Sequence, residues 1–130
     1  MSTTKRATVA MRFRDLDAYG HVNNSTMFNY LEEARVSLFG EDFYKTPMDE
    51  LQFIVQKTCC TYIRPLLPQS HIDVVMDIVK MERSRFIIDY VIEDSEGIKY
   101  AEASTTMACF NPKTNRPASI PEWFRKRVGE

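Results

Sequence analysis

One long helical pattern followed by an extended region of strand patterns constrains this chain more than any other feature. From Asn24 to Phe39 apolar side chains recur with the spacing of one helix face, and Gly40 follows where a helix-ending glycine is expected. Either Asn23 or Asn24 suits the N-cap. From Phe53 to Phe110 β-branched and aromatic residues dominate, and prolines and glycines interrupt them. We therefore expect one long helix packed against a sheet.

A short strand before the helix and four long strands after it are predicted, and their residue ranges are Ala7–Phe13, Phe53–Arg64, Ile72–Glu82, Phe86–Glu93 and Lys99–Phe110. Residues 41–51 read as a loop or a short second helix, 94–97 as a hairpin turn, 111–121 as a loop and 122–128 as a short terminal helix. This order indicates an α+β fold in which a curved antiparallel five-stranded sheet wraps around one helix. Because only one sheet face is covered, pairing with a second copy is expected.

Length and composition favour a single domain that spans residues 1–130. The chain is 44% hydrophobic and has a formal charge of −1, so there is no global electrostatic case for binding nucleic acid or an anionic membrane. No signal-peptide core or membrane-length apolar run is present, which favours a cytoplasmic protein. Three cysteines without zinc spacing suit reduced strand residues, and the sequence indicates no metal and no cofactor.

Residues 15–24, Asp-Leu-Asp-Ala-Tyr-Gly-His-Val-Asn-Asn, place carboxylates and a glycine turn directly before the helix. A helix N-terminus offers unpaired N–H groups and the positive end of a dipole, and both favour negative charge on a carbonyl oxygen. Asp17 is the candidate nucleophile or general base, and the N–H groups from about Val22 to Asn24 are the candidate donors. This segment is therefore a candidate site for attack on a carbonyl.

The chain resembles the hotdog-fold acyl-CoA thioesterases, and more narrowly the 4-hydroxybenzoyl-CoA thioesterase and YbgC-like group. The resemblance rests on the order of elements, the D-x-D-x-x-G of residues 15–20, the positions of Tyr30 and Glu33 in the helix, and the T-Y-I-R-P-L of residues 61–66. It covers a core of about residues 7–111 and leaves 112–130 as a C-terminal tail. It implies a hotdog fold, a homodimer or a tetramer of dimers, and active sites at the subunit interface.

By position, the resemblance implies that Asp17 is the catalytic carboxylate and that Gly20 makes the turn that presents N–H groups to the thioester oxygen. His21 and Asn24 are further candidate catalytic residues, because His21 can supply a proton and Asn24 occupies the position of a family histidine. Val22 and Asn23 are expected to bind substrate. The H-V-N-N segment also resembles that of fatty acyl-carrier-protein thioesterases, which leaves the acyl carrier open between CoA and a carrier protein.

Other charged and aromatic residues have less specific expected roles. Asp15 is expected to cap the loop or pair with a nearby arginine. Tyr30 is expected mainly to pack and Glu33 to pair with a basic neighbour, although either can line a partner's substrate pocket. Arg83 and Arg85, and the basic run of residues 125–127, are candidate contacts for the phosphates of CoA.

Two classes of function remain open from the sequence. The first is hydrolysis of acyl-CoA to the free acid and CoA. The second is a hotdog module that binds acyl thioesters without hydrolysing them. The different Asp and His arrangement of hotdog hydratases finds no match here, and a metal site built from Asp15, Asp17 and His21 lacks the ligands to complete it.

Overall fold

One antiparallel sheet and one long helix make up most of the computed structural model, which describes residues 4–40, 42–69 and 71–129. The ends of the predicted domain, residues 1–3 and 130, lie outside the described residues, as does residue 41 at the start of the predicted loop or short helix. The strands are β1 (Lys5–Ala10), β2 (Gln52–Tyr62), β3 (His71–Met81), β4 (Arg85–Glu93), β5 (Lys99–Asn111) and β6 (Arg116–Pro117). The helices are the 3₁₀ turn η1 (Phe13–Asp15), α1 (Asn24–Phe39), α2 (Asp42–Lys45) and α3 (Glu122–Arg127).

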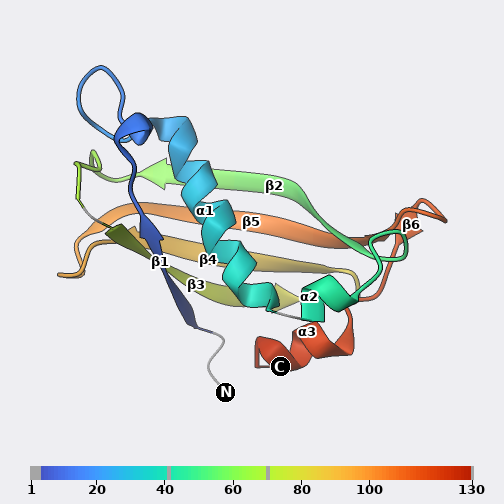
Figure 1. Cartoon of the computed structure of the whole chain (residues 1–130). Coiled ribbons are helices and arrows are strands. Elements are labelled where there is room, and N and C mark those ends of the chain that lie inside the picture. Colours follow the sequence, from blue (N-terminus) through green and yellow to red (C-terminus); the bar gives the residue numbers. More distant parts are fainter. Residues whose placement is uncertain (1–3, 41, 70, 130) are drawn as a thin grey trace.

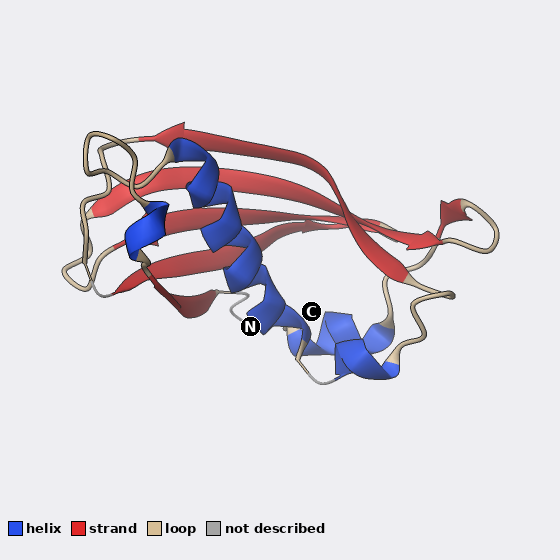
Figure 2. Cartoon of the chain, turned by 45° about the horizontal axis from the view of Figure 1, so that its top comes forward, coloured by secondary structure: helices blue, strands red, loops and turns tan. Residues whose placement is uncertain are grey.

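The sheet has the strand order β1-β3-β4-β5-β2, and the two-residue β6 pairs with β5. All of its pairings are antiparallel. The helix α1 crosses one face of the curved sheet diagonally (Figures 1 and 2). The predicted α+β hotdog arrangement is therefore confirmed, and β2 is left as an edge strand with β5 as its neighbour.

The bounds of α1 agree with the sequence prediction because both of its ends are specified locally. Asn23 is the N-cap, and its side-chain oxygen accepts a hydrogen bond from the backbone N–H of Ser25 at 2.9 Å. Gly40 ends the helix with a φ of 63°, in the region that glycine enters without steric cost. The sheet-facing side of α1 carries the buried residues Met27, Tyr30, Leu31, Ala34, Arg35, Leu38 and Phe39.

Strand alternation supplies the other half of the core. Every second residue is buried from Ile72 to Met76 in β3 and from Phe86 to Ile92 in β4, as the period of two requires, and the fully buried members are Ile72, Val74, Met76, Phe86, Ile88, Tyr90 and Ile92. An aromatic cluster fills the end of the core near α3. Phe39 of α1 lies 4.8 Å from Phe53 of β2, and Phe86 of β4 lies 4.8 Å from Phe124 of α3, measured between ring centroids.

The C-terminal end of α1 is capped from a distant part of the chain. Arg127 donates hydrogen bonds from Nε to the carbonyl of Leu38 at 2.6 Å and from Nη2 to the carbonyl of Ser37 at 3.2 Å. A Cβ added at Gly40 would lie 2.5 Å from the guanidinium carbon of Arg127. The positive φ and this close approach together explain why the position holds glycine.

We expect Gly40→Ala to lower the free energy of unfolding by about 1–3 kcal/mol, because it strains the backbone and displaces the Arg127 cap. Urea denaturation followed by circular dichroism measures this change. Gly97→Ala is the matched control, since Gly97 has a φ of 83° with no atom within 4 Å of the added Cβ. An equal loss in both variants would show that contact with Arg127 adds nothing to the backbone strain.

The structure corrects two details of the sequence prediction. The first strand ends at Ala10, and Phe13, expected at the strand end, lies in η1 with its side chain 92% exposed. The backbone N–H of Arg12 donates to the Asp15 carboxylate at 2.9 Å, and this bond turns the chain out of the sheet. In the tail, β6 adds a sixth strand where a loop was expected.

Candidate active site

Residues 16–22 form a small hairpin that projects beyond one end of the sheet (Figure 1). Leu16 and Val22 make an antiparallel bridge at its base. The N–H of Asp17 donates to the carbonyl of His21 at 2.7 Å, and the N–H of Gly20 donates to the carbonyl of Asp17 at 3.1 Å. The φ of Gly20 is 76°, so the predicted glycine turn is present.

Asp17 is exposed, and its side chain is held in place by the backbone of its own hairpin. Its Oδ1 accepts hydrogen bonds from the N–H groups of Tyr19 at 2.8 Å and His21 at 3.2 Å. Its other carboxylate oxygen accepts no hydrogen bond from the residues that the structure describes. The geometry thus fixes the carboxylate and leaves one oxygen available to a water molecule or a carbonyl carbon.

Asp15 lies below the hairpin and is 4% exposed. Its carboxylate accepts hydrogen bonds from the Tyr30 hydroxyl at 2.6 Å and from the N–H of Arg12 at 2.9 Å. Burial alone would raise the pKa of Asp15, but these bonds and the charge of Arg12 together lower it below its ordinary value. Its backbone carbonyl accepts from the N–H of Asn23 at 2.8 Å. Asp15 therefore joins the hairpin to the start of α1.

Tyr30 and Glu33 belong to the network of hydrogen bonds and ion pairs around Asp15 and Arg12. Neither residue lines the cavity that contains Asp17 and is described next. Tyr30 is fully buried, and burial together with its bond to Asp15 raises its pKa. Glu33 pairs with Arg12 at 3.2 Å between Oε1 and Nη2. The structure thus gives Glu33 the basic neighbour expected from the sequence and gives Tyr30 a hydrogen bond to Asp15 in addition to packing.

A cavity of about 240 Å³, called here the Asp17 cavity, lies between the hairpin, the start of α1 and the segment made of the end of β2 and the loop after it. Its lining residues come from these three segments and are Asp17, His21, Val22, Asn24, Met27, Tyr62, Ile63, Arg64, Pro65 and Leu66. Tyr62 and Arg64 were not among the predicted site residues, although they belong to the T-Y-I-R-P-L segment that carries the family resemblance. The Tyr62 hydroxyl donates to the carbonyl of Asn24 at 2.9 Å and so ties β2 to the helix start.

Only some of the backbone N–H groups at the helix start are free to donate to a substrate. This reduces the set of donors that the sequence predicted from Val22 to Asn24. The N–H of Val22 donates to the carbonyl of Leu66 at 2.9 Å, and that of Asn23 donates to Asp15. Among the described residues, the N–H of Asn24 has no acceptor, and Asn24 lines the cavity. The first turn of α1 holds no acidic residue, so no carboxylate there offsets the positive end of its dipole. Asn24 is therefore the backbone donor that remains for a carbonyl oxygen.

His21 and Asn23 differ in how free their side chains are. The ring of His21 is half-buried, lines the cavity and stacks on Tyr19 with 6.5 Å between ring centroids. The side-chain oxygen of Asn23 accepts from the N–H and the hydroxyl of Ser25, so it is committed to capping. Asn24, the other cap candidate, is the first residue of the helix instead.

Arg83 and Arg85 lie at the turn between β3 and β4, at the end of the sheet away from the hairpin (Figure 1). Arg83 donates to the Ser119 hydroxyl at 2.9 Å, and Arg85 pairs with Glu82 at 3.6 Å. Within one chain, these arginines and Asp17 are not brought together. Arg64 is instead the exposed cation that lines the Asp17 cavity.

Burial disfavours the thiolate form of two of the three cysteines. All three are free, and burial raises the pKa of Cys109 to about 12 and also raises that of Cys60. Within the described part of the chain, no group of three His, Cys, Asp or Glu side chains is placed to hold a metal ion. None of the described helices combines the length and the apolar character needed to cross a membrane.

Comparisons with known proteins identify the family and the fold of the chain. The profile of the Thioesterase-like superfamily matches residues 11–128. The long-chain acyl-CoA thioesterase FadM of Escherichia coli is 25% identical over 123 residues, which cover 92% of this chain and 93% of FadM. The uncharacterized protein YsmA of Bacillus subtilis is 29% identical over 89 residues, which cover 68% of this chain but only 60% of YsmA.

A solved structure shows the same fold over nearly its whole length. The PA2801 protein of Pseudomonas aeruginosa superposes with a TM-score of 0.86 at 25% identity, covering 95% of this chain and 97% of that one. Family membership of this kind supports thioester hydrolysis as the reaction. The chain has the hotdog thioesterase fold and belongs to the Thioesterase-like superfamily.

Proposed function

We propose that this protein hydrolyses acyl-CoA thioesters to the free acid and CoA. The observation that carries the proposal is that one cavity holds both a fixed carboxylate with a free oxygen, Asp17, and a free N–H at a helix N-terminus, Asn24. Attack on a thioester carbonyl needs a nucleophile or base on one side and a donor for the developing oxyanion on the other.

In the proposed reaction the carbonyl oxygen of the thioester accepts a hydrogen bond from the backbone N–H of Asn24. Asp17 either removes a proton from a water molecule that adds to the carbonyl carbon, or adds to that carbon itself. The negative charge passes to the oxygen, where Asn24 and the dipole of α1 stabilise it. Collapse of this intermediate breaks the carbon–sulfur bond and releases CoA as thiolate. When Asp17 adds, water then cleaves the acyl-aspartate anhydride. His21 lines the same cavity and is the proposed donor of a proton to the leaving group.

CoA is favoured over a carrier protein as the acyl carrier. FadM, which matches along 92% of this chain, is a long-chain acyl-CoA thioesterase. Arg64, in the wall of the cavity, provides a guanidinium for the phosphates of CoA. Arg83 and Arg85 lie far from Asp17 of their own chain. We propose that they contact the phosphates of CoA bound at the active site of a second copy. The free cysteines suit a cytoplasmic location, which is part of the proposal.

We infer that the chain forms a homodimer, or a tetramer built from dimers. The edge strand β2 is eleven residues long, and its free edge invites pairing with another strand. Large apolar side chains are exposed on β2 and on α1, and they are Phe28, Val36, Ile54, Val55 and Tyr62. A second copy that pairs through β2 would cover those on β2.

Release of free thiol from acyl-CoAs of graded chain length tests the proposed reaction. We expect turnover with at least one acyl-CoA in the series, measured with a thiol-reactive dye. Binding of acyl-CoA by calorimetry without thiol release would instead identify a non-catalytic binding module. Release from acyl-carrier proteins alone would identify the other carrier and contradict the choice of CoA.

A further inference from the structure

Arg35 is a charged side chain buried between α1 and the sheet. It is 8% exposed and lies among the sheet-facing residues of the helix. Its Nη1 donates a hydrogen bond to the Tyr90 hydroxyl at 3.2 Å. None of the ion pairs between described residues includes Arg35. A guanidinium, which keeps its proton, is therefore buried here without a carboxylate partner in the described part of the chain.

The polar groups around Arg35 are hydroxyls and carry no negative charge. Burial raises the pKa of Tyr90, so its hydroxyl keeps its proton at neutral pH. Tyr90 also shares a hydrogen bond with the Thr105 side chain, and Thr105 Oγ1 lies 3.3 Å from Thr58 Oγ1. Burial of a cation costs free energy unless an anion lies beside it. The surroundings of Arg35 therefore favour an anionic ligand.

Part of the Arg35 guanidinium is free to bind such a ligand. Its Nε and Nη2 have no acceptor among the described residues. Across the same residues, every side-chain nitrogen or oxygen that is shut off from solvent has a hydrogen-bond partner. Nε and Nη2 therefore keep contact with solvent, although the side chain as a whole is buried. N–H groups of a guanidinium can bind both oxygens of one carboxylate.

A row of side chains on α1 leads from the Asp17 cavity to Arg35. Residues four apart are neighbours on a helix surface, so Met27, Leu31 and Arg35 follow one another along α1. Met27 lines the Asp17 cavity, and Leu31 is fully buried. The distance from Met27 to Arg35 along the helix axis is about 12 Å. This row offers an apolar wall that ends in a cation.

The inner face of β2 gives the same separation. Tyr62, which lines the Asp17 cavity, and Thr58, which contacts the hydroxyls near Arg35, point to the same side of the strand. Four residues of a strand span about 13 Å. An extended carbon chain advances about 1.2 Å per bond, so about ten bonds cover this separation.

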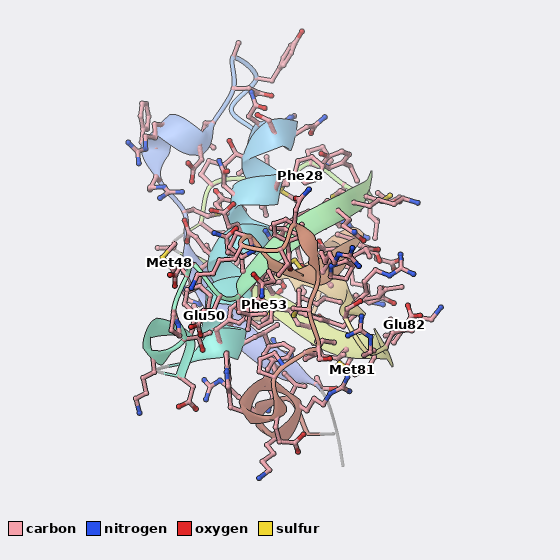
Figure 3. All side chains as sticks on the ribbon, turned by 90° about the vertical axis from the view of Figure 1, so that its right-hand side faces the viewer. Phe28, Met48, Glu50, Phe53, Met81 and Glu82 are labelled. Atoms are coloured by element: carbon pink, nitrogen blue, oxygen red, sulfur yellow. The ribbon has the colours of Figure 1, made fainter. Side chains whose placement is uncertain are left out.

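The aromatic cluster closes the layer between α1 and the sheet beyond Arg35. Phe39 follows Arg35 in the same row of α1, and its ring lies 4.8 Å from that of Phe53 of β2. Figure 3 views the molecule from this end, with Phe53 near the middle. A chain that starts in the Asp17 cavity and runs along α1 thus meets the cation of Arg35 before it meets this aromatic wall.

We propose that Arg35 binds a carboxylate at the far end of the acyl group, so that the protein prefers acyl-CoAs whose acyl chain ends in a second carboxylate. This inference rests on the proposed acyl-CoA hydrolysis at Asp17. Both ends of the path belong to one chain, with the thioester at Asp17 and Asn24 and the terminal carboxylate at Arg35. Arg35 is then a specificity-determining residue and takes no part in the bond cleavage.

The ratio of kcat/KM for sebacyl-CoA to that for decanoyl-CoA tests this role, because the two acyl chains are equally long and differ in the terminal carboxylate. We expect the ratio to exceed one in wild type and to fall at least about tenfold in Arg35→Met, as for loss of a hydrogen bond to a charged group. Turnover of decanoyl-CoA should stay close to wild type. Arg116→Met is the matched control, since it removes the same charge from an exposed position on β6.

Thermal unfolding provides a second measurement that does not depend on turnover. Arg35→Met leaves no carboxylate of the described residues without its partner, so we expect it to unfold at a temperature no lower than wild type. Sebacate should raise the unfolding temperature of wild type more than decanoate does, and this difference should vanish in Arg35→Met. Arg35→Lys keeps the charge but lacks the planar guanidinium, and we expect an intermediate difference.

The outcomes separate this inference from the proposed reaction. Equal kcat/KM ratios in wild type and Arg35→Met would overturn the role of Arg35 while leaving the hydrolysis intact. Equal effects of sebacate and decanoate on wild type would overturn it as well, even if Arg35→Met failed to fold. Absence of thiol release by wild type from every acyl-CoA would instead refute the hydrolysis itself.

Discussion

Replacement of Asp17 by Asn is expected to lower kcat for acyl-CoA hydrolysis by at least about 100-fold, because it removes the nucleophile or general base. In the structure, Asp17 Oδ1 accepts hydrogen bonds from the N–H groups of Tyr19 and His21. The Asn side chain retains an oxygen that can accept the same two hydrogen bonds. The hairpin should therefore keep its shape. What is lost is the negative charge and the basicity of the free oxygen.

The loss is measured as thiol release at saturating acyl-CoA. Asp89→Asn is the charge-matched control, since Asp89 is exposed on β4 and does not line the Asp17 cavity. Thermal unfolding and binding of a non-hydrolysable thioether analogue should be close to wild type in both variants. Unchanged turnover in Asp17→Asn would remove this residue from the chemistry.

Replacement of Asp15 by Asn is expected to lower the free energy of unfolding by about 1.5–3 kcal/mol at neutral pH, the usual range for hydrogen bonds to a charged group. Asp15 is buried and accepts hydrogen bonds from Tyr30 and Arg12. An amide weakens these bonds and removes the charge that faces the Arg12 guanidinium. The backbone carbonyl of Asp15, which accepts a hydrogen bond from the N–H of Asn23, is unchanged in this variant, so the helix start keeps that bond.

The effect of Asp15 depends on pH with a definite sign. Hydrogen bonds lower the pKa of this carboxylate in the folded state, against the opposing effect of burial. Its stabilising contribution is therefore fully present well above about pH 4, the region where an unfolded Asp titrates. The contribution is lost as the pH falls through the lowered folded pKa. The difference between wild type and Asp15→Asn should be largest at neutral pH and should shrink in acid.

Urea denaturation at several pH values measures this difference, and Tyr30→Phe provides a second variant that removes the hydroxyl and keeps the ring. Asp15 and Tyr30 share a hydrogen bond of 2.6 Å, so their double-mutant cycle should give a coupling above about 0.5 kcal/mol. Additive effects at neutral pH would show that this bond does not stabilise the fold.

The parts of the fold that follow local rules were predictable. Helix α1 begins after a capping Asn23 and ends at Gly40, and the strands after it lie close to the expected ranges. The first strand was predicted too long because the turn at Phe13–Asp15 depends on the Asp15 carboxylate accepting the N–H of Arg12. Apolar alternation alone carries no information about that bond. Strand β6 was missed because two residues show no periodicity.

The candidate site was predictable as a segment but not as a set of free groups. Three consecutive N–H groups were candidate donors, and tertiary contacts engage two of them. The carbonyl of Leu66, from the loop after β2, accepts the N–H of Val22, and the carbonyl of Asp15 accepts that of Asn23. Arg64 lines the same cavity as Asp17, because the segment after β2 folds against the helix start.

By itself, the sequence determined the long helix, the strand-rich remainder and the segment that carries Asp17 and Gly20, because capping, turn and periodicity signals act between neighbours in the chain. Only the tertiary structure decided which polar groups of that segment stay free, which cation lines the Asp17 cavity, and that a second, apolar cavity lies at the other end of β2. Hydrogen-bond acceptors and cavity walls come from residues distant in the chain, and their positions depend on how the sheet curves around α1.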